Sequence, residues 1–275
     1  MAKILTYNNR PIDYGGIPSR SARPKSWSGF ELSSFNGAYI WTDGTDTYYS
    51  YGATHYVLNP STSTWTRIVW DGLVSFYGDC IWTDNTHIYY SNSSNYQYVL
   101  NKNTKAWSRK AWSTSGFIGI DGRDVWTDGI YIYFSSGTLH YVLNGNVWNQ
   151  KTWNGYITTE FGGRDIWHEG NNIYYSTSLK QYYLKTSTST WYAKTWSGLP
   201  YFDGRYVWSD GNSIYYSNGS TQYILNGDSS WSPISWGINF TGDNVWEQDG
   251  KYYVGGNYQL VITYPTGNYN FISYT

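Results

Sequence analysis

A single tryptophan recurs six times along the chain at nearly constant spacing. The copies are 41, 44, 41, 41 and 38 residues apart and stand at Trp41, Trp82, Trp126, Trp167, Trp208 and Trp246. A glycine always lies four residues earlier, at Gly37, Gly78, Gly122, Gly163, Gly204 and Gly242. A period of about 40 residues is typical of folds in which repeated units bury their apolar faces against each other. The chain is therefore predicted to form a ring or an array of such units.

Each repeat contains further matching positions, which indicate short antiparallel strands. In the first repeat these are the turn Thr42-Asp43-Gly44, the aromatic pair Tyr48-Tyr49, the segment 56–59 and two tryptophans, Trp65 and Trp70. Asp-Gly between apolar runs is a strong hairpin signal. Adjacent apolar residues break the simple alternation of a half-buried strand, which is expected where both faces of a sheet are covered. We therefore predict an all-β fold, a six-bladed β-propeller with four-stranded antiparallel blades.

The sixth repeat and the start of the chain determine how the ring would close. The repeats occupy residues 35–275, and the sixth aligns with an aromatic pair at Tyr252-Tyr253 and with Tyr269 and Tyr274 in place of the last two tryptophans. The last blade is thus expected to have its own outer strand. Trp27-Ser28-Gly29 resembles the end of an outer strand elsewhere, Trp196-Ser197-Gly198. We expect the segment around Trp27 to lie near the sixth blade and to help fasten the ring.

Residues 1–34 precede the repeats, and 1–26 differ from them in composition. This segment has five basic residues and one acidic residue, a balance of +4, whereas the remaining chain carries −5. Its prolines and lack of hydrophobic periodicity predict an extended arm without strand or helix. An assembly tether is one hypothesis, with docking residues Ile4, Leu5, Tyr7, Arg10 and Ile12. A solvated tail is the alternative, and a deletion starting the chain at Ser26 is expected to leave the fold intact.

Composition excludes several classes of protein. Aromatic residues make up 21% of the chain and charged residues 13%, which argues against disorder. Cys80 is the only cysteine, so no disulfide can form within the chain. No apolar run approaches the roughly 20 residues of a membrane span, and we expect no signal peptide. The net charge of −1, without a clustered basic field on the repeats, predicts no nucleic-acid partner.

The repeat resembles the kelch repeat. The segment from Tyr56 to Trp65 matches that family's Tyr-x-x-(Asp/Asn)-x-x-Thr-x-x-Trp stretch, as does the segment from Tyr98 to Trp107, and Gly204-Arg205 matches the residues before its inner strand. The double glycine expected after the tyrosine strand is replaced in most repeats, for example by Ser217-Asn218-Gly219. The resemblance covers residues 35–275 and implies the propeller fold.

A second resemblance concerns the setting of the protein. Near-identical repeats rich in Thr-Asp-Gly, Tyr-Tyr-Ser-Asn and Ser-Thr-Ser-Thr-Trp are similar to those of bacteriophage virion proteins, particularly tail and fibre components. This resemblance implies a structural or adhesive role in a phage particle. It also implies a virion location, other virion proteins as partners, and homo-oligomers within the particle.

Galactose oxidase shares the kelch propeller, so the resemblance raises the question of copper. The histidines are His55, His87, His140 and His168. Two of them share a repeat position with glutamines, and this position comprises His55, Gln97, His140, Gln181, Gln222 and Gln259. A position shared by His and Gln favours a repeated hydrogen-bonding role over a metal site. We expect no metal and no other cofactor.

An acidic residue stands two residues after each of five anchor tryptophans, at Asp43, Asp84, Asp128, Glu169 and Asp210. A glycosidase would need two carboxylates roughly 5–10 Å apart across one sugar. Because each residue occupies the same turn of its own repeat, a turn-stabilising role is the preferred interpretation. Asp boxes of the sialidase type are absent, and Cys80 beside Ile81-Trp82 is predicted to be a buried filler. We expect no enzymatic activity.

One repeat position breaks the symmetry. Three residues before the anchor tryptophans stand Ala38, Asp79, Arg123, Arg164, Arg205 and Asp243. These residues should crowd one mouth of the central channel. The arginines are either binding residues or structural ones that pair with Asp124, Asp165 or the next blade.

The segments that link the repeats vary most in sequence, and they carry aromatic residues, among them Phe117, Tyr156 and Tyr201. Variable loops on a rigid scaffold commonly bind partners, but these rings could equally pack over the blade edges. The leading hypothesis is a non-enzymatic phage propeller that binds a host-surface glycan or a protein. A free carbohydrate-binding lectin is the first alternative, and an oxidase or glycosidase is the second.

Overall fold

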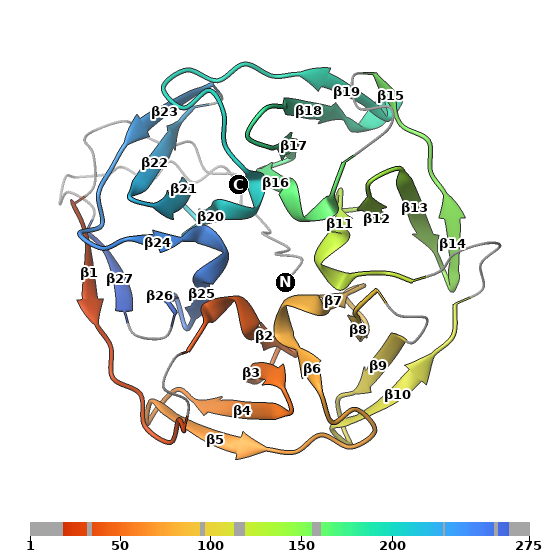
Figure 1. Ribbon diagram of the computed structural model, residues 1–275, viewed down its shortest axis with the longest axis vertical. Coiled ribbons are helices and arrows are strands. Elements are labelled where there is room, and N and C mark those ends of the chain that lie inside the picture. Colours follow the sequence, from red (N-terminus) through yellow and green to blue (C-terminus); the bar gives the residue numbers. More distant parts are fainter. Residues whose placement is uncertain are drawn as a thin grey trace, which may run out of the picture.

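The computed structural model describes residues 19–31, 35–93, 97–112, 119–155, 161–227, 229–255 and 258–263. These residues form six mainly antiparallel sheets arranged in a ring, as Figure 1 shows. The predicted six-bladed β-propeller is confirmed. No helix in the described part of the chain is long and apolar enough to cross a membrane.

The first three blades follow the chain order from the channel outward. Blade 1 consists of β2 (Ile40–Thr42), β3 (Thr47–Gly52), β4 (Thr54–Asn59) and β5 (Thr64–Ile68). Blade 2 consists of β7 (Ile81–Thr83), β8 (Ile88–Ser91), β9 (Gln97–Asn101) and β10 (Ala106–Lys110). Blade 3 consists of β11 (Val125–Thr127), β12 (Ile132–Ser136), β13 (Leu139–Asn144) and β14 (Val147–Gln150).

Blades 4 and 5 repeat this order, and short linker strands join several blades. Blade 4 consists of β16 (Ile166–Glu169), β17 (Asn172–Ser176), β18 (Gln181–Lys185) and β19 (Thr190–Ala193). Blade 5 consists of β20 (Val207–Ser209), β21 (Ile214–Gly219), β22 (Thr221–Asn226) and β23 (Ser230–Pro233). The linker strands are β6 (Phe76–Tyr77), which pairs with β3, β15 (Asn154–Gly155), which pairs with β19, and β24 (Phe240–Thr241), which pairs with β21.

Blade 6 closes the ring and combines the two ends of the repeat region. It consists of β25 (Val245–Gln248), β26 (Lys251–Val254), β27 (Tyr258–Thr263) and, next to β27, β1 (Ser19–Pro24). Six residue pairs join β1 to β27 in antiparallel register. The prediction that 1–26 contain no strand is therefore wrong for residues 19–24, and an N-terminal segment occupies the outer position expected for the C-terminal one. Residues 264–275 lie outside the described residues.

Trp27 belongs to the same closure. Its ring lies 5.5 Å from that of Trp246 and 5.3 Å from that of Tyr253, both in blade 6, and 6.0 Å from that of Trp65 in blade 1. The expectation that this segment lies near the sixth blade is confirmed. Trp246 stacks on Tyr253, as every other anchor tryptophan stacks on the residue seven positions later. The pair in blade 6 is thus Tyr253-Val254, one residue later than the sequence alignment placed it.

Every inner strand begins after a short 3-10 turn that carries the recurrent glycine. The turns are η1 (Gly37–Tyr39), η2 (Gly78–Cys80), η3 (Gly122–Asp124), η4 (Gly163–Asp165), η6 (Gly204–Tyr206) and η7 (Gly242–Asn244); a further turn, η5 (Thr186–Thr188), precedes β19. A Cβ atom on Gly163 would lie 2.0 Å from the carbonyl oxygen of Asp124 in the preceding blade. Glycine is required here because two blades approach each other at the backbone.

The anchor tryptophans join the blades into one core. Trp41 is fully buried, stacks on Tyr48 and donates a hydrogen bond of 2.9 Å from Nε1 to Ser50 Oγ. The same bond recurs in blades 2 to 5. In blades 1 to 4, the second tryptophan of the same blade and the first of the next blade pack against this stack, as Trp70 and Trp107 do at 5.5 and 6.0 Å from Trp41. Burial of large aromatic side chains at every joint accounts for the aromatic composition.

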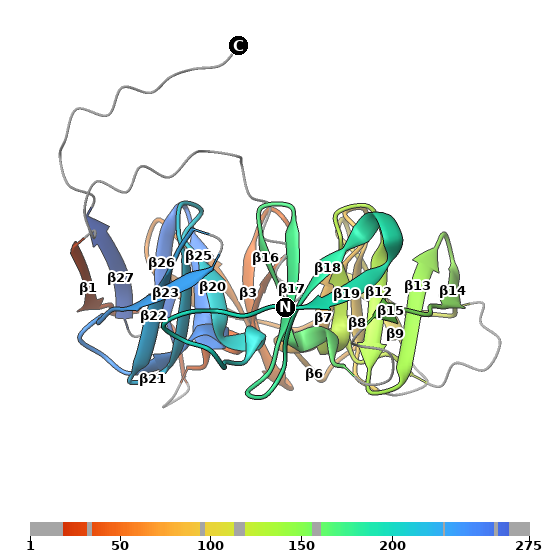
Figure 2. The same cartoon turned by 90° about the horizontal axis from the view of Figure 1, so that it is seen from above.

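The two faces of the ring have different loops. Figure 2 shows the strands running between the faces, with turns at both ends. The glycine turns, the linkers and the turns between second and third strands lie on one face, which we call the entry face because the inner strands begin there. The Asp-Gly turns that follow the inner strands lie on the opposite face, the exit face.

Candidate binding site at the channel mouth

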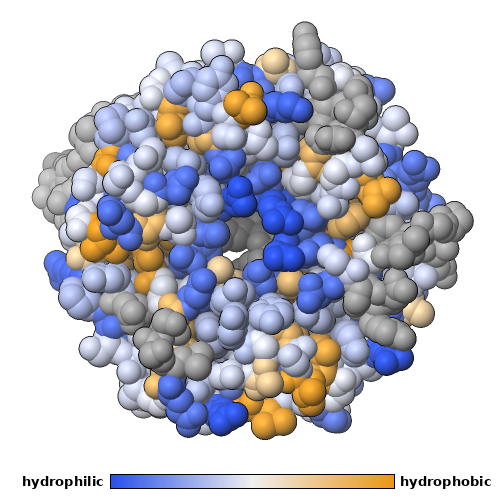
Figure 3. All heavy atoms as spheres, viewed as in Figure 1, coloured by the Kyte–Doolittle hydropathy of each residue, from blue (hydrophilic) through white to orange (hydrophobic). Residues whose placement is uncertain are grey.

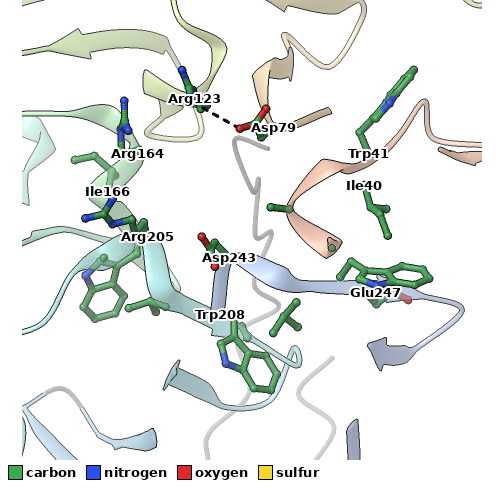
Figure 4. Close-up of a pocket in the computed structure, with 18 of the residues that line it drawn as sticks. Ile40, Trp41, Asp79, Arg123, Arg164, Ile166, Arg205, Trp208, Asp243 and Glu247 are labelled. Atoms are coloured by element: carbon green, nitrogen blue, oxygen red, sulfur yellow. Dashed lines mark ion pairs between the residues drawn. The ribbon is translucent and has the colours of Figure 1, made fainter. Parts of the chain in front are cut away.

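The middle residue of each 3-10 turn lines the channel at the entry face. We call this set the mouth ring, and it comprises Ala38, Asp79, Arg123, Arg164, Arg205 and Asp243. These residues line a cavity of about 580 Å³ together with the inner strands. Figure 3 shows hydrophilic side chains around the central opening, and Figure 4 shows three arginines and two aspartates of the mouth ring around the pocket. The predicted crowding of these residues at one mouth is confirmed.

Each arginine of the mouth ring contacts a carboxylate of the preceding blade. Arg123 Nη1 lies 3.9 Å from Asp79 Oδ2, and Arg164 Nε lies 3.2 Å from Asp124 Oδ1. Arg205 Nε lies 3.8 Å from Asp165 Oδ1. The expected pairing with Asp124 and Asp165 is confirmed. The arginines therefore help to join consecutive blades, whether or not they also bind a ligand.

The three arginines differ in how fully their N–H groups are used. Arg123 donates two hydrogen bonds to Asp121, at 3.0 Å from Nε and 2.6 Å from Nη2. Arg164 makes one such bond, and the contacts of Arg205 with Asp165 and Asp203 are both 3.8 Å long, beyond hydrogen-bond distance. Arg164 and Arg205 thus have the greater capacity to donate to a ligand in the channel mouth.

The carboxylates of this region titrate in opposite directions. Burial disfavours the charge of Asp121, but the hydrogen bonds from Arg123 outweigh it and lower the pKa of the carboxyl. Burial raises the pKa of Asp165 to about 6, because the distant contact with Arg205 compensates only in part and Asp203 adds repulsion. The carboxyl group of Asp165, between blades 4 and 5, is therefore protonated at higher pH than that of Asp121, between blades 2 and 3.

The recurrent aspartates stabilise exit-face turns. Asp43 Oδ1 accepts hydrogen bonds from the backbone N–H groups of Thr45 and Asp46, at 2.9 and 2.8 Å, and Oδ2 accepts from the hydroxyl of Tyr48 at 3.0 Å. Asp84, Asp128 and Asp210 make the same set of contacts, and Glu169 accepts from Tyr174. The predicted turn-stabilising role is confirmed for the four aspartates.

In three blades the position shared by His and Gln forms a hydrogen bond to the following linker. His55 Nε2 lies 3.2 Å from the carbonyl oxygen of Val74, and its ring stacks on Phe76. Gln181 Nε2 and Gln222 Nε2 donate to linker carbonyl groups, those of Phe202 and Ile238. The predicted hydrogen-bonding role is confirmed for these three residues but is wrong for His140, whose two ring nitrogens are buried without a hydrogen-bond partner while the ring stacks on Phe161. Cys80 is 2% exposed, and burial raises the pKa of its thiol, which agrees with its prediction as a buried filler.

The other predicted binding residues are only partly described. Tyr201 lies on the entry face in the linker before blade 5, and 62% of it is exposed. Phe117 and Tyr156 lie outside the described residues, as do the arm residues Ile4, Leu5, Tyr7, Arg10 and Ile12. The structure does not bring Tyr201 into contact with the mouth ring.

Sequence reasoning missed a cluster of three tyrosines beside the mouth ring. Tyr39, Tyr51 and Tyr77 come from η1, β3 and β6. The centroid of the Tyr39 ring lies 4.9 Å from that of Tyr51 and 6.1 Å from that of Tyr77, and the last two are 5.4 Å apart. Each is an aromatic residue at a repeat position that other repeats mostly fill with a small or polar residue. This difference between repeats is the sequence feature from which the cluster could have been predicted. No protein-family model and no curated protein matches the chain.

Proposed function

We propose that the protein is a non-enzymatic binding propeller that attaches through its entry face to a glycan or protein on a host surface. One observation carries the proposal. The recurrent acidic residues, His55 and His140 are used in structural contacts, whereas the departures from six-fold symmetry gather around the entry-face mouth. Residues that differ between otherwise equal repeats are those free to serve recognition.

The mouth ring has the physical properties of a recognition site. About two-fifths of the side chain is exposed in Arg123, Arg164 and Arg205, although each is held by a neighbouring carboxylate. Such side chains lose less conformational freedom when they bind, since their orientation is already restricted. Arginine also binds carboxylates and sugar hydroxyl groups through several N–H donors at once.

We further propose that this propeller is a tail, fibre or capsid-associated component of a bacteriophage particle. The support is the likeness of its repeats to those of virion proteins and a surface rich in Ser, Thr, Asn and Tyr. In this proposal the residues before β1 dock on other virion proteins, and several copies assemble in one particle. A free lectin would use the same entry face but would not be part of a particle.

Binding of the fluorescently labelled protein to intact host cells tests the proposal. The double variant Arg164→Ala/Arg205→Ala is expected to bind at least tenfold more weakly, because it removes the least-used donors of the mouth ring. Arg67→Ala/Arg109→Ala, on the outer strands of blades 1 and 2, is the matched control and should bind within twofold of wild type. Equal binding by all three proteins would contradict an entry-face site.

Two further measurements separate the alternatives. Immunogold labelling of purified particles distinguishes a virion component from a free lectin, because only the former labels the particle. Assays for galactose oxidation and for glycoside hydrolysis are expected to give no turnover. Turnover that disappears in an Asp43→Asn or His55→Gln variant would replace the proposal with an enzyme.

A further inference from the structure

The tyrosine cluster lies directly beside the position where the mouth ring has its smallest side chain. Ala38 stands next to Tyr39 in η1, and the neighbouring mouth residue is Asp79 in η2. Burial raises the pKa of Tyr39, and the nearby charge of Asp79 raises it further. The phenol of Tyr39 therefore stays neutral, close to a carboxylate and to the open part of the channel mouth.

The three rings are rigidly positioned and accessible. Tyr51 in β3 is paired with Tyr77 in β6 across two antiparallel strands, and Tyr39 is held by its 3-10 turn. The exposed fractions are 47% for Tyr51 and 37% for Tyr77. Clustered aromatic side chains with this exposure are unusual on a surface that has no partner.

The cluster occurs at one joint of the ring only, among the residues that the structure describes. The equivalent positions between blades 2 and 3 are Cys80, Asn92 and Asp121, and Asn92 pairs with Asp121 as Tyr51 pairs with Tyr77. Since that joint closes with small and polar side chains, the ring does not require tyrosines here. The extra aromatic surface needs another explanation.

We propose that Tyr39, Tyr51 and Tyr77 bind a neutral hexose unit of a glycan, an inference that rests on the proposed binding function and specifies its ligand. Tyrosine offers a large, rigid surface with an apolar face and a hydroxyl group at low entropic cost. The C–H face of a hexose packs on such rings, and its hydroxyl groups reach polar neighbours such as Asp79. The cation of Arg123 lies between Asp121 and Asp79, so the site has no net positive charge to select an acidic sugar.

Titration calorimetry with neutral and acidic oligosaccharides tests this inference. The probes are maltohexaose, cellohexaose, mannohexaose and chitohexaose, with hexagalacturonate as the acidic comparison. At least one neutral probe is expected to bind, and Tyr51→Ala and Tyr77→Ala should each weaken it about tenfold. Tyr51→Phe, which keeps the ring, should bind within about threefold of wild type.

Tyr131→Ala is the matched control, because Tyr131 is 53% exposed but lies in an exit-face turn. It should bind the neutral probe like wild type. Binding of only the acidic probe, binding of no probe, or equal binding by Tyr51→Ala and wild type would each overturn the inference. The proposed function fails separately: host-cell binding lost in Arg164→Ala/Arg205→Ala but kept in Tyr51→Ala leaves a binding propeller without the tyrosine site.

Discussion

Two joints of the ring are built from the same strands but different side chains. Between blades 4 and 5, Trp231 packs 6.0 Å from Trp167, 5.9 Å from Trp196 and 5.1 Å from Phe202. Between blades 5 and 6, the corresponding position in the outer strand is Ala22, which pairs with Leu260 as Trp231 pairs with Leu225. We call this second joint the seam, because it is where the N-terminal strand closes the ring.

At the seam, several smaller contacts take the place of the indole ring that Trp231 provides between blades 4 and 5. The ring of Tyr252 lies 6.3 Å from that of Trp208, the guanidinium of Arg20 lies 5.5 Å from the centroid of Tyr215, and Ala22 N–H donates to the carbonyl of Trp236 at 3.1 Å. The seam therefore depends on backbone pairing, whereas the other joint depends on aromatic burial. A small side chain such as that of Ala22 is therefore tolerated at the seam, provided that β1 remains paired with β27.

Removal of that strand is expected to have the largest effect. A chain beginning at Ser26 lacks β1 and leaves β27 unpaired on its outer side, so the earlier expectation of an intact fold no longer holds. We expect the melting temperature to fall by roughly 10 °C or more, since several kcal/mol of pairing and burial are lost. A chain beginning at Pro18 keeps β1 and should melt within about 2 °C of wild type in a calorimetric scan. Equal melting of both truncated proteins would show that β1 does not close the ring.

The glycine at the joint between blades 3 and 4 offers an internal comparison with its neighbour. Gly163→Val should cost about 4 kcal/mol, because any Cβ meets the Asp124 carbonyl oxygen at 2.0 Å. Gly162→Ala is the control, since its Cβ would lie 3.5 Å from the nearest atom and its φ of −105° suits any residue. Urea unfolding measures both, and a similar loss in the two variants would assign the glycine column another cause.

Truncation at the two equivalent outer-strand positions compares the joints directly. Trp231→Ala should destabilise by roughly 3–5 kcal/mol, because Trp231 is 2% exposed and packs on three rings. Ala22→Gly should cost only about 1 kcal/mol, mainly through backbone entropy. If chemical unfolding finds comparable losses, the seam carries more side-chain packing than its contacts indicate.

The pH dependence of stability is expected to be the smallest effect. Asp165 has a pKa of about 6 in the folded protein, above the value of about 3.9 in an unfolded chain, so the folded state holds its proton more tightly. The contribution of Asp165 to the free energy of unfolding therefore falls as pH rises from about 4 to 6. Asp165→Asn should gain on wild type by about 1 kcal/mol over this range, measured by urea unfolding at each pH. A constant difference between the two proteins would mean that the carboxyl titrates normally.

The fold was largely predictable because each repeat preserves the contacts that hold it. The glycine column reflects a backbone approach and the tryptophan column a buried stack, and both are local to the repeat. β1 was not predicted, since its prolines and charges suggest an irregular arm. Pro24 is nevertheless compatible with an edge strand, where one side of the backbone has no partner strand. In blade 1 the outer-strand tryptophan, Trp65, stands five residues before the second one, Trp70. Trp27 corresponds to Trp70, so the same spacing places Ala22 at the outer-strand position and would have predicted a strand there.

The candidate site was predictable in part for the same reason. The mouth ring follows from one repeat position, and the structure confirms its location at the channel. The tyrosine cluster combines three different repeat positions, one of them in a linker. It forms because the linker strand β6 pairs with β3 of blade 1, and the sequence alone does not show which linker residue lies opposite which strand residue.

We propose that the positions repeated in every blade stabilise the ring, and that the positions that differ between blades at the entry face bind the glycan or protein partner. Asp43→Ala removes an acceptor of two backbone N–H groups and the Tyr48 hydroxyl, so it should cost about 2 kcal/mol. Arg164→Ala/Arg205→Ala should also lower stability, because it leaves the carboxylates of buried Asp124 and largely buried Asp165 without these partners. Host-cell affinity and unfolding free energy, measured on both proteins, test the claim most directly. We expect both variants to unfold more easily than wild type, with unchanged affinity for Asp43→Ala and at least tenfold weaker affinity for the arginine variant. Affinity that falls in Asp43→Ala but not in the arginine variant would contradict it.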